Sequence, residues 1–199
     1  MMMWKRIPDS IKCLILGVFL GTLAKYLDTV AVDGSWHTRA LHHVSTLFTR
    51  LGIWVLIAAI IAARSKSMIR AAVNPFAFLA GMLISYYLYS AYLFGFFPTE
   101  YFVFWGSLAL LSPLAGIIVW QAKHDARLAY FLPALPMGLL LSLALGMGQY
   151  YMHVNYMEEL IMYGVLCALF FKNVKQIAVS VVLSLVVAVL TEELSPFYF

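Results

Sequence analysis

Long apolar stretches, separated by short basic segments, dominate the sequence. Seven apolar segments cover residues 11–32, 51–63, 71–97, 101–122, 128–148, 152–171 and 176–191. Several of them approach the roughly 20 residues that a helix needs to cross the ~30 Å hydrocarbon core of a bilayer. The pattern predicts an all-α fold, a polytopic transmembrane helical bundle of about seven spans in one integral membrane domain over residues 1–199. An alternative arrangement has six spans and one re-entrant segment.

Local signals add detail to this pattern at three places. The segment 36–49 mixes histidines with large apolar side chains and is too polar to span. It predicts an amphipathic helix at the outer membrane interface. Pro133 and Pro136 are expected to kink the fifth segment. Asp9 or Ser10 is expected to cap the start of the first helix.

The composition supports a membrane location. Hydrophobic residues make up 64% of the chain and charged residues only 11%, whereas charged residues are roughly a quarter of a soluble domain. The mean hydropathy is +0.91. The lipid bilayer is therefore the expected partner, and little of the chain is left for a soluble domain.

The distribution of basic residues predicts how the bundle is oriented. Ten of the 13 Lys and Arg residues lie on one side of the predicted spans. They are Lys5, Arg6, Lys12, Arg64, Lys66, Arg70, Lys123, Arg127, Lys172 and Lys175. The positive-inside rule makes this side cytoplasmic, which places the N-terminus in the cytoplasm and the C-terminus outside. The net charge of +4 is thus an orientation signal, and we expect no nucleic-acid partner.

A charged pair inside the first segment is the most informative polar feature. Only 12 uncharged residues separate Lys12 from Lys25, and as a helix they span ~18 Å of the ~30 Å core. A spanning helix must therefore carry Lys25, and Asp28 with it, into the outer half of the membrane. An unpaired charge there costs a few kcal/mol. Their spacing of three residues puts both side chains on one helix face, so they can pair.

Other ionisable side chains and several tyrosines are expected at a similar depth. Arg50 begins a short apolar segment, and the sixth helix is expected to start near Met152, which draws Glu158 and Glu159 below the outer surface. The third segment adds tyrosines at about the same level. The predicted ligand-binding residues are Lys25, Asp28, Arg50, Tyr86, Tyr87, Glu158 and Glu159.

We interpret this set as an outward-facing intramembrane cavity that binds, and translocates, a small polar or zwitterionic solute. The carboxylates would bind the cationic group of the solute, Lys25 its anionic group and the tyrosines its body. A structural interpretation stays open. In it, the charged residues only lock helices together, and the tyrosines form an aromatic belt at the membrane interface.

Two other classes of function are consistent with the sequence. Gly17 and Gly21 form a GxxxG face that allows another helix to approach closely, either within the chain or from a partner membrane subunit. An accessory or assembly subunit would use this face to bind such a partner. An intramembrane enzyme acting on lipid or peptide would use Glu159 as a base, together with histidines of the 36–49 helix. The sequence shows no nucleophile–base pair and no phosphate-binding loop, so no catalytic residue is assigned. The cysteines and histidines lack the spacing of a metal site, and no cofactor is predicted.

Three resemblances can be stated. Residues 17–28, 85–89 and 95–98 resemble a group of small bacterial multi-pass membrane proteins without an assigned activity, which implies the bacterial cytoplasmic (inner) membrane. In size, hydrophobicity and first helix, the chain is similar to substrate-binding subunits of energy-coupling-factor vitamin importers, which usually have six spans. Residues 158–164 are similar to the first motif of the CAAX-protease-like family. Tyr163 stands at that family's arginine position and no histidine follows, so its catalytic roles are not carried over.

Overall fold

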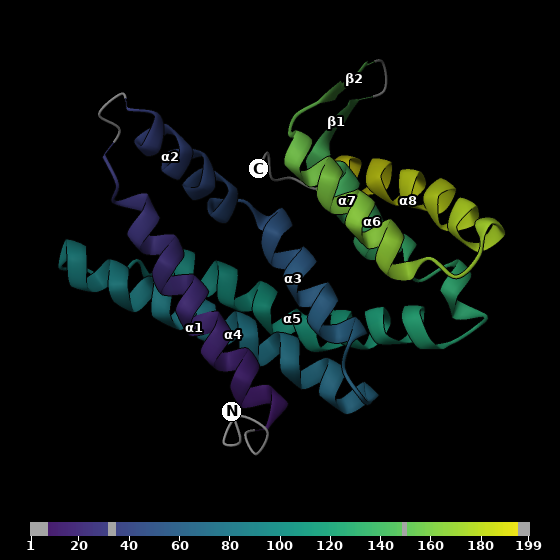
Figure 1. Ribbon diagram of the computed structural model, residues 1–199, viewed down its shortest axis with the longest axis horizontal. Coiled ribbons are helices and arrows are strands. Elements are labelled where there is room, and N and C mark those ends of the chain that lie inside the picture. Colours follow the sequence, from purple (N-terminus) through teal and green to yellow (C-terminus); the bar gives the residue numbers. More distant parts are fainter. Residues whose placement is uncertain (1–7, 32–34, 149–150, 195–199) are drawn as a thin grey trace.

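A computed structural model of the chain describes residues 8–31, 35–148 and 151–194 (Figure 1). Two features of the sequence analysis lie outside these residues: the basic pair Lys5 and Arg6, and the predicted helix end at Val32. The described residues form eight α-helices, one short 3-10 helix and one antiparallel β-hairpin. The helices are α1 (Asp9–Asp28), α2 (Trp36–Thr49), α3 (Leu51–Ala63), α4 (Met68–Phe94), α5 (Thr99–His124), η2 (Leu128–Tyr130), α6 (Ala134–Ala144), α7 (Met157–Phe170) and α8 (Val174–Leu194). The strands are β1 (Leu145–Gly148) and β2 (Tyr151–Val154). The fold is thus all-α apart from the hairpin.

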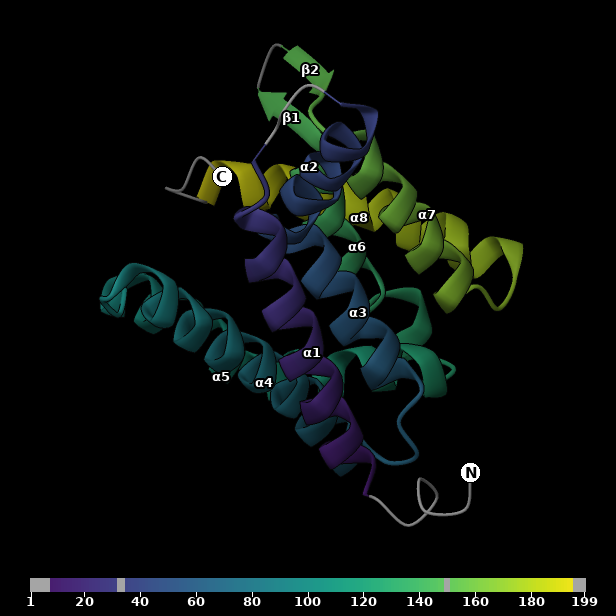
Figure 2. The same cartoon turned by 60° about the vertical axis from the view of Figure 1, so that its left-hand side comes forward.

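The helices form two groups with α3 between them (Figure 1). One group contains α1, α4 and α5, and the other contains α6, α7 and α8. Figure 2 shows the same arrangement from a second side. Trp54 of α3 packs in the apolar core of the first group, whereas Leu56 packs in that of the second. Since α3 contributes to both cores, it joins the two halves of the bundle.

Glycines allow α1 and α4 to approach closely. A Cβ atom on Gly17 would lie 2.0 Å from the Phe78 carbonyl oxygen, and one on Gly21 would lie 2.3 Å from that of Met82. On the facing helix, a Cβ atom on Gly81 would meet the backbone of α1 in the same way. This small-residue face is therefore used within the chain. The packing agrees with the interpretation of this face as an internal one and gives no support to a partner subunit there.

The structure corrects the prediction for the fifth and sixth segments. Pro133 is the N-cap of α6 and Pro136 lies in its first turn, where proline is tolerated because the first N–H groups have no partner within the helix. These prolines start a helix instead of kinking one. The hairpin extends to Val154, so α7 begins at Met157 and not near Met152.

Four helices among the described residues, α1, α4, α5 and α8, are long and apolar enough to cross a membrane. The helices α2 and α3 meet the same criterion as a pair, but they bend by 66° where Arg50 separates them. The chain is therefore a multi-pass helical membrane protein with four such spans, or five if the bent pair counts as one. The amphipathic helix predicted for residues 36–49 is confirmed as a helix with these bounds.

The first turns of α1 and α4 are tied together by charge. Pro8 is the N-cap of α1, so the predicted cap at Asp9 or Ser10 is wrong. Asp9 lies instead in the first turn, with a carboxylate oxygen 3.2 Å from Arg70 Nη1 and 4.0 Å from Lys66 Nζ. These contacts gather basic residues that the sequence places on one side of the spans.

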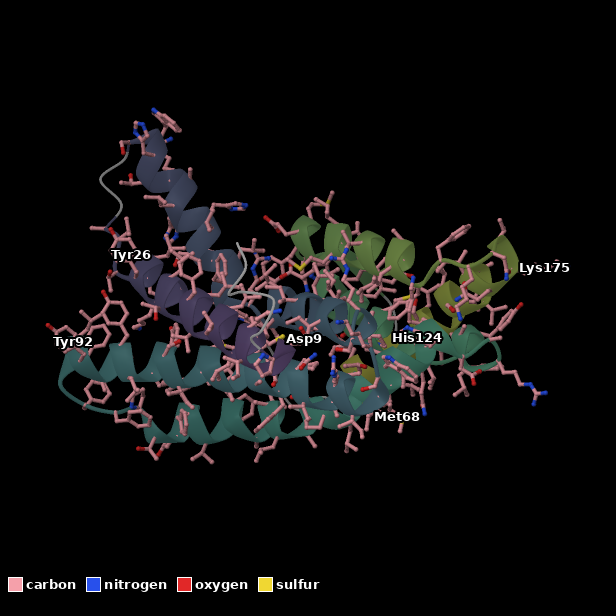
Figure 3. All side chains as sticks on the ribbon, turned by 60° about the horizontal axis from the view of Figure 1, so that its bottom comes forward. Asp9, Tyr26, Met68, Tyr92, His124 and Lys175 are labelled. Atoms are coloured by element: carbon pink, nitrogen blue, oxygen red, sulfur yellow. The ribbon has the colours of Figure 1, made fainter. Side chains whose placement is uncertain are left out.

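A second contact of a basic residue lies at the end of α5. The Lys172 ammonium, between α7 and α8, donates a 3.0 Å hydrogen bond to the Asp125 carbonyl at the end of α5. Figure 3 shows His124 and Lys175 at the opposite end of the molecule from Tyr92, which lies near the end of α4.

Candidate functional site

The predicted pair on α1 forms, and its carboxylate is shared with two other helices. Lys25 Nζ lies 3.7 Å from Asp28 Oδ2. The same oxygen accepts a 2.6 Å hydrogen bond from the Tyr86 hydroxyl of α4, and Oδ1 accepts a 2.9 Å bond from the Ser45 hydroxyl of α2. We call these four residues the Asp28 group. Both carboxylate oxygens have a donor, so the group fastens α1, α2 and α4 together.

Arg50 makes the second polar group at the break between α2 and α3. Its backbone is extended there, and Nη1 lies 2.8 Å from Glu159 Oε2 and 3.4 Å from Glu158 Oε2. The guanidinium also lies over the Tyr156 ring, 4.1 Å from its centroid, which favours the cation. Arg50, Glu158 and Glu159, together with His43, are called the Glu159 group.

The two glutamates of this group differ in exposure. The Glu159 side chain is 1% exposed, whereas that of Glu158 is 28% exposed. Glu158 Oε1 lies 2.9 Å from Nε2 of His43, which is itself largely exposed. The group holds one more carboxylate than guanidinium, and Glu158 is the more exposed of its two carboxylates.

Glycine allows the buried carboxylate to lie against α3. A Cβ atom on Gly52, in the first turn of α3, would lie 2.8 Å from Glu159 Cγ. Glu159 itself belongs to the first turn of α7. The N-terminal turns of two helices therefore meet at this carboxylate. Helix N-termini have unpaired N–H groups and a partial positive charge, both of which favour a negative group.

The predicted site residues separate into two groups rather than one. Lys25, Asp28 and Tyr86 meet in the Asp28 group, and the three residues Arg50, Glu158 and Glu159 meet in the Glu159 group. Tyr87 has no hydrogen bond or ion pair with either group among the described residues, but its ring packs edge-on against Tyr86 at 5.2 Å. It packs in an aromatic cluster with ring centroids 6.2 Å from Phe97 and 5.6 Å from Phe102.

Two members of the groups, Ser45 and His43, and two residues that contact the Glu159 group, Tyr156 and Gly52, were not among the predicted ligand-binding residues. Ser45 and His43 come from α2, Tyr156 precedes α7, and Gly52 opens α3. The mixed polar and apolar pattern of residues 36–49 indicated that α2 has a polar face, and that was the available signal. Which helices this face meets depends on the packing of α2, which its own sequence does not encode.

A cavity of about 340 Å³ lies between α3, α4, α5 and α6. Its lining is apolar except for Ser112, whose hydroxyl donates a 2.6 Å hydrogen bond to the Ala109 carbonyl of its own helix. None of the predicted ligand-binding residues lines it. The cavity is thus distinct from both polar groups.

Neither the geometry nor the comparisons add a cofactor. Within residues 8–31, 35–148 and 151–194, no group of three or more His, Cys, Asp or Glu side chains is placed to hold a metal ion. Comparisons of the chain with protein-family models, with curated proteins and with solved structures found no match.

Proposed function

We propose that this multi-pass membrane protein binds, and translocates, a small polar solute at the break between α2 and α3. The observation that carries the proposal is the meeting of Arg50 with Glu158 and Glu159 at the point where a membrane-length helix pair bends by 66°. Transporters commonly place substrate and ion sites at discontinuous membrane helices, because the helix ends there offer unpaired backbone groups. Ionisable residues inside membrane segments mark such pathways.

The chemistry of the Glu159 group favours a solute with a cationic group. Arg50 neutralises the buried Glu159, whereas Glu158 shares that guanidinium at a longer distance and is partly exposed. An ammonium or guanidinium of the solute would pair with Glu158, and an anionic group of a zwitterion would find Arg50 or protonated His43. The Asp28 group is less suited to bind a charged solute, because Lys25 and Asp28 already neutralise each other.

The proposal includes a membrane arrangement of seven spans with the N-terminus in the cytoplasm and the C-terminus outside. The gathering of Lys66, Arg70 and Lys172 near the starts of α1 and α4 and the end of α5 supports this orientation. In this arrangement α6 and α7 would be short spans, with the hairpin on the outer side. The resemblance to small bacterial multi-pass proteins makes the bacterial inner membrane the proposed location.

Native mass spectrometry of the gently purified protein tests the proposal. We expect a small bound molecule in the original protein and in Glu193→Gln, which changes an exposed carboxylate near the end of α8. We expect Glu158→Gln to lose that molecule, because an amide cannot pair with a cation. In a thermal-stability screen with small ammonium compounds and amino-acid zwitterions, the original protein and Glu193→Gln should be stabilised, whereas Glu158→Gln should not. Two results would contradict the proposal: a folded Glu158→Gln protein that keeps the bound molecule, or a Glu158→Gln protein that is stabilised by the same compounds as the original protein.

The two alternative functions have less support in the geometry. An accessory subunit was predicted to dock through Gly17 and Gly21, and α4 fills that face. An intramembrane enzyme needs a glutamate that is free to accept a proton, and Glu159 is engaged by Arg50 at 2.8 Å. Co-purification of a partner polypeptide without any small molecule would favour the accessory role.

A further inference from the structure

The apolar cavity between α3, α4, α5 and α6 has the properties of a hydrocarbon site. Its inner surface includes the buried side chains of Trp54, Met82 and Val119. Its only hydroxyl side chain, Ser112, is already bonded to its own helix. A buried water needs two to four polar partners, so this lining does not favour water. Its volume of about 340 Å³ falls within the range of roughly 300–1,000 Å³ that is typical of small-molecule sites.

Two exposed residues of the lining indicate where the cavity opens. Leu111 of α5 and Leu135 of α6 line the cavity, and they are 58% and 43% exposed. α6 packs mainly on α7 and α8 and makes few or no close contacts with α5, so we place the opening at the side, between α5 and α6. Leu111 lies at the middle of α5 (Thr99–His124), ~18–20 Å of helix from either end. In a helix that crosses the bilayer, this is the level of the acyl chains.

We propose that this cavity binds one hydrocarbon chain of a membrane lipid, which enters sideways between α5 and α6. An unfilled apolar space of this size would leave its walls without van der Waals contacts, and acyl chains are the molecules that stand at the mouth. The bound chain would contact Trp54 in the first turns of α3, the helix that begins directly after Arg50. This lipid site is independent of the solute site, since no member of the Glu159 group lines the cavity.

Quenching of Trp54 fluorescence by brominated lipid tests the proposal. A variant that keeps Trp54 and replaces the other four tryptophans by phenylalanine is reconstituted in two kinds of vesicle, one of dioleoylphosphatidylcholine and one of the phosphatidylcholine brominated at the same acyl positions. Bromine quenches tryptophan at short range. Trp54 is only 7% exposed, so direct access from the surrounding bilayer is small. We expect a large loss of emission in the brominated vesicles, because the acyl chain reaches the indole inside the cavity.

Two matched variants, each made in the protein that keeps only Trp54 as a tryptophan, test whether the acyl chain enters through the cavity mouth. Ala115→Phe places a ring at the exposed part of the lining, whereas Leu114→Phe places one at the adjacent lipid-facing position of α5, which is not part of the lining. We expect Ala115→Phe to restore most of the emission and Leu114→Phe to leave the quenching unchanged. Equal emission in both kinds of vesicle before these substitutions, or equal quenching in the two phenylalanine variants, overturns the proposal. Circular dichroism establishes that each variant is folded before the comparison is made.

Discussion

Removing Arg50 should destabilise the protein far more than removing an exposed arginine from the same helix. The Arg50–Glu159 contact of 2.8 Å corresponds to an attraction of ~6 kcal/mol at an effective dielectric constant of about 20. Desolvation of the two ions costs several kcal/mol each, so the intact pair comes close to breaking even. Arg50→Met removes the attraction but leaves Glu159 desolvated. We therefore expect the free energy of unfolding to fall by about 3–5 kcal/mol.

The matched control is Arg64→Met, at the other end of α3. Arg64 is exposed, and substitutions of this kind usually change stability by less than about 0.5 kcal/mol. A second variant, Arg50→Met with Glu159→Leu, removes the stranded carboxylate as well. It should recover a large part of the loss, because replacing both partners of a buried pair is often close to neutral.

Equilibrium unfolding in mixed micelles of dodecylmaltoside and sodium dodecyl sulfate measures these differences. Helix content from circular dichroism is followed as the sulfate detergent increases, and the free energy of unfolding is extrapolated to its absence. Equal stability of Arg50→Met and Arg64→Met would refute the reasoning, since a desolvated carboxylate cannot lose its main partner without cost. A double variant less stable than Arg50→Met alone would also refute it.

Two further predictions use the same unfolding measurement. Gly17→Val should lower the free energy of unfolding by about 1–3 kcal/mol, because its Cβ atom would lie 2.0 Å from the Phe78 carbonyl oxygen. The control is Gly106→Val, since a Cβ atom at Gly106 meets nothing within 4 Å. Similar losses of stability in both variants would contradict this explanation. At the end of α5, the backbone N–H of Leu128 donates to the Asp125 carboxylate and holds the pKa of that carboxyl below its ordinary value of 3.8. The folded state thus binds fewer protons, so this contribution to stability is present above the ordinary pKa and is lost as the pH falls below it. Asp125→Asn should reduce the pH dependence of unfolding as the pH falls below the ordinary value of 3.8, and an unchanged slope there would count against the assignment.

The sequence predicted those features that depend on local chemistry and on the length of apolar segments. The bounds of the helix at residues 36–49 agree with the structure, and Lys25 pairs with Asp28 as their spacing on one helix face indicates. Both predictions need only the rise and the periodicity of a helix.

The direction in which each helix presents its side chains could not be predicted in the same way. The meeting of Arg50 with Glu159 depends on the packing of α3 against α7, and that of Ser45 with Asp28 depends on how α2 lies beside α1. Hydropathy also failed across residues 145–148 and 151–154, where the predicted ends of two helices form the strands of a hairpin. Apolar composition alone does not distinguish a helix from a short strand.

The position of α2 has a mechanical consequence. One short helix and the residue that follows it supply Ser45 to the carboxylate of α1, and His43 and Arg50 to the glutamates of α7. A displacement of α2 that lengthens the contact with α1 therefore also strains the contacts with α7. Because the segment formed by α2 and Arg50 takes part in both polar groups, the contacts of α1 and those of α7 are coupled through this one segment.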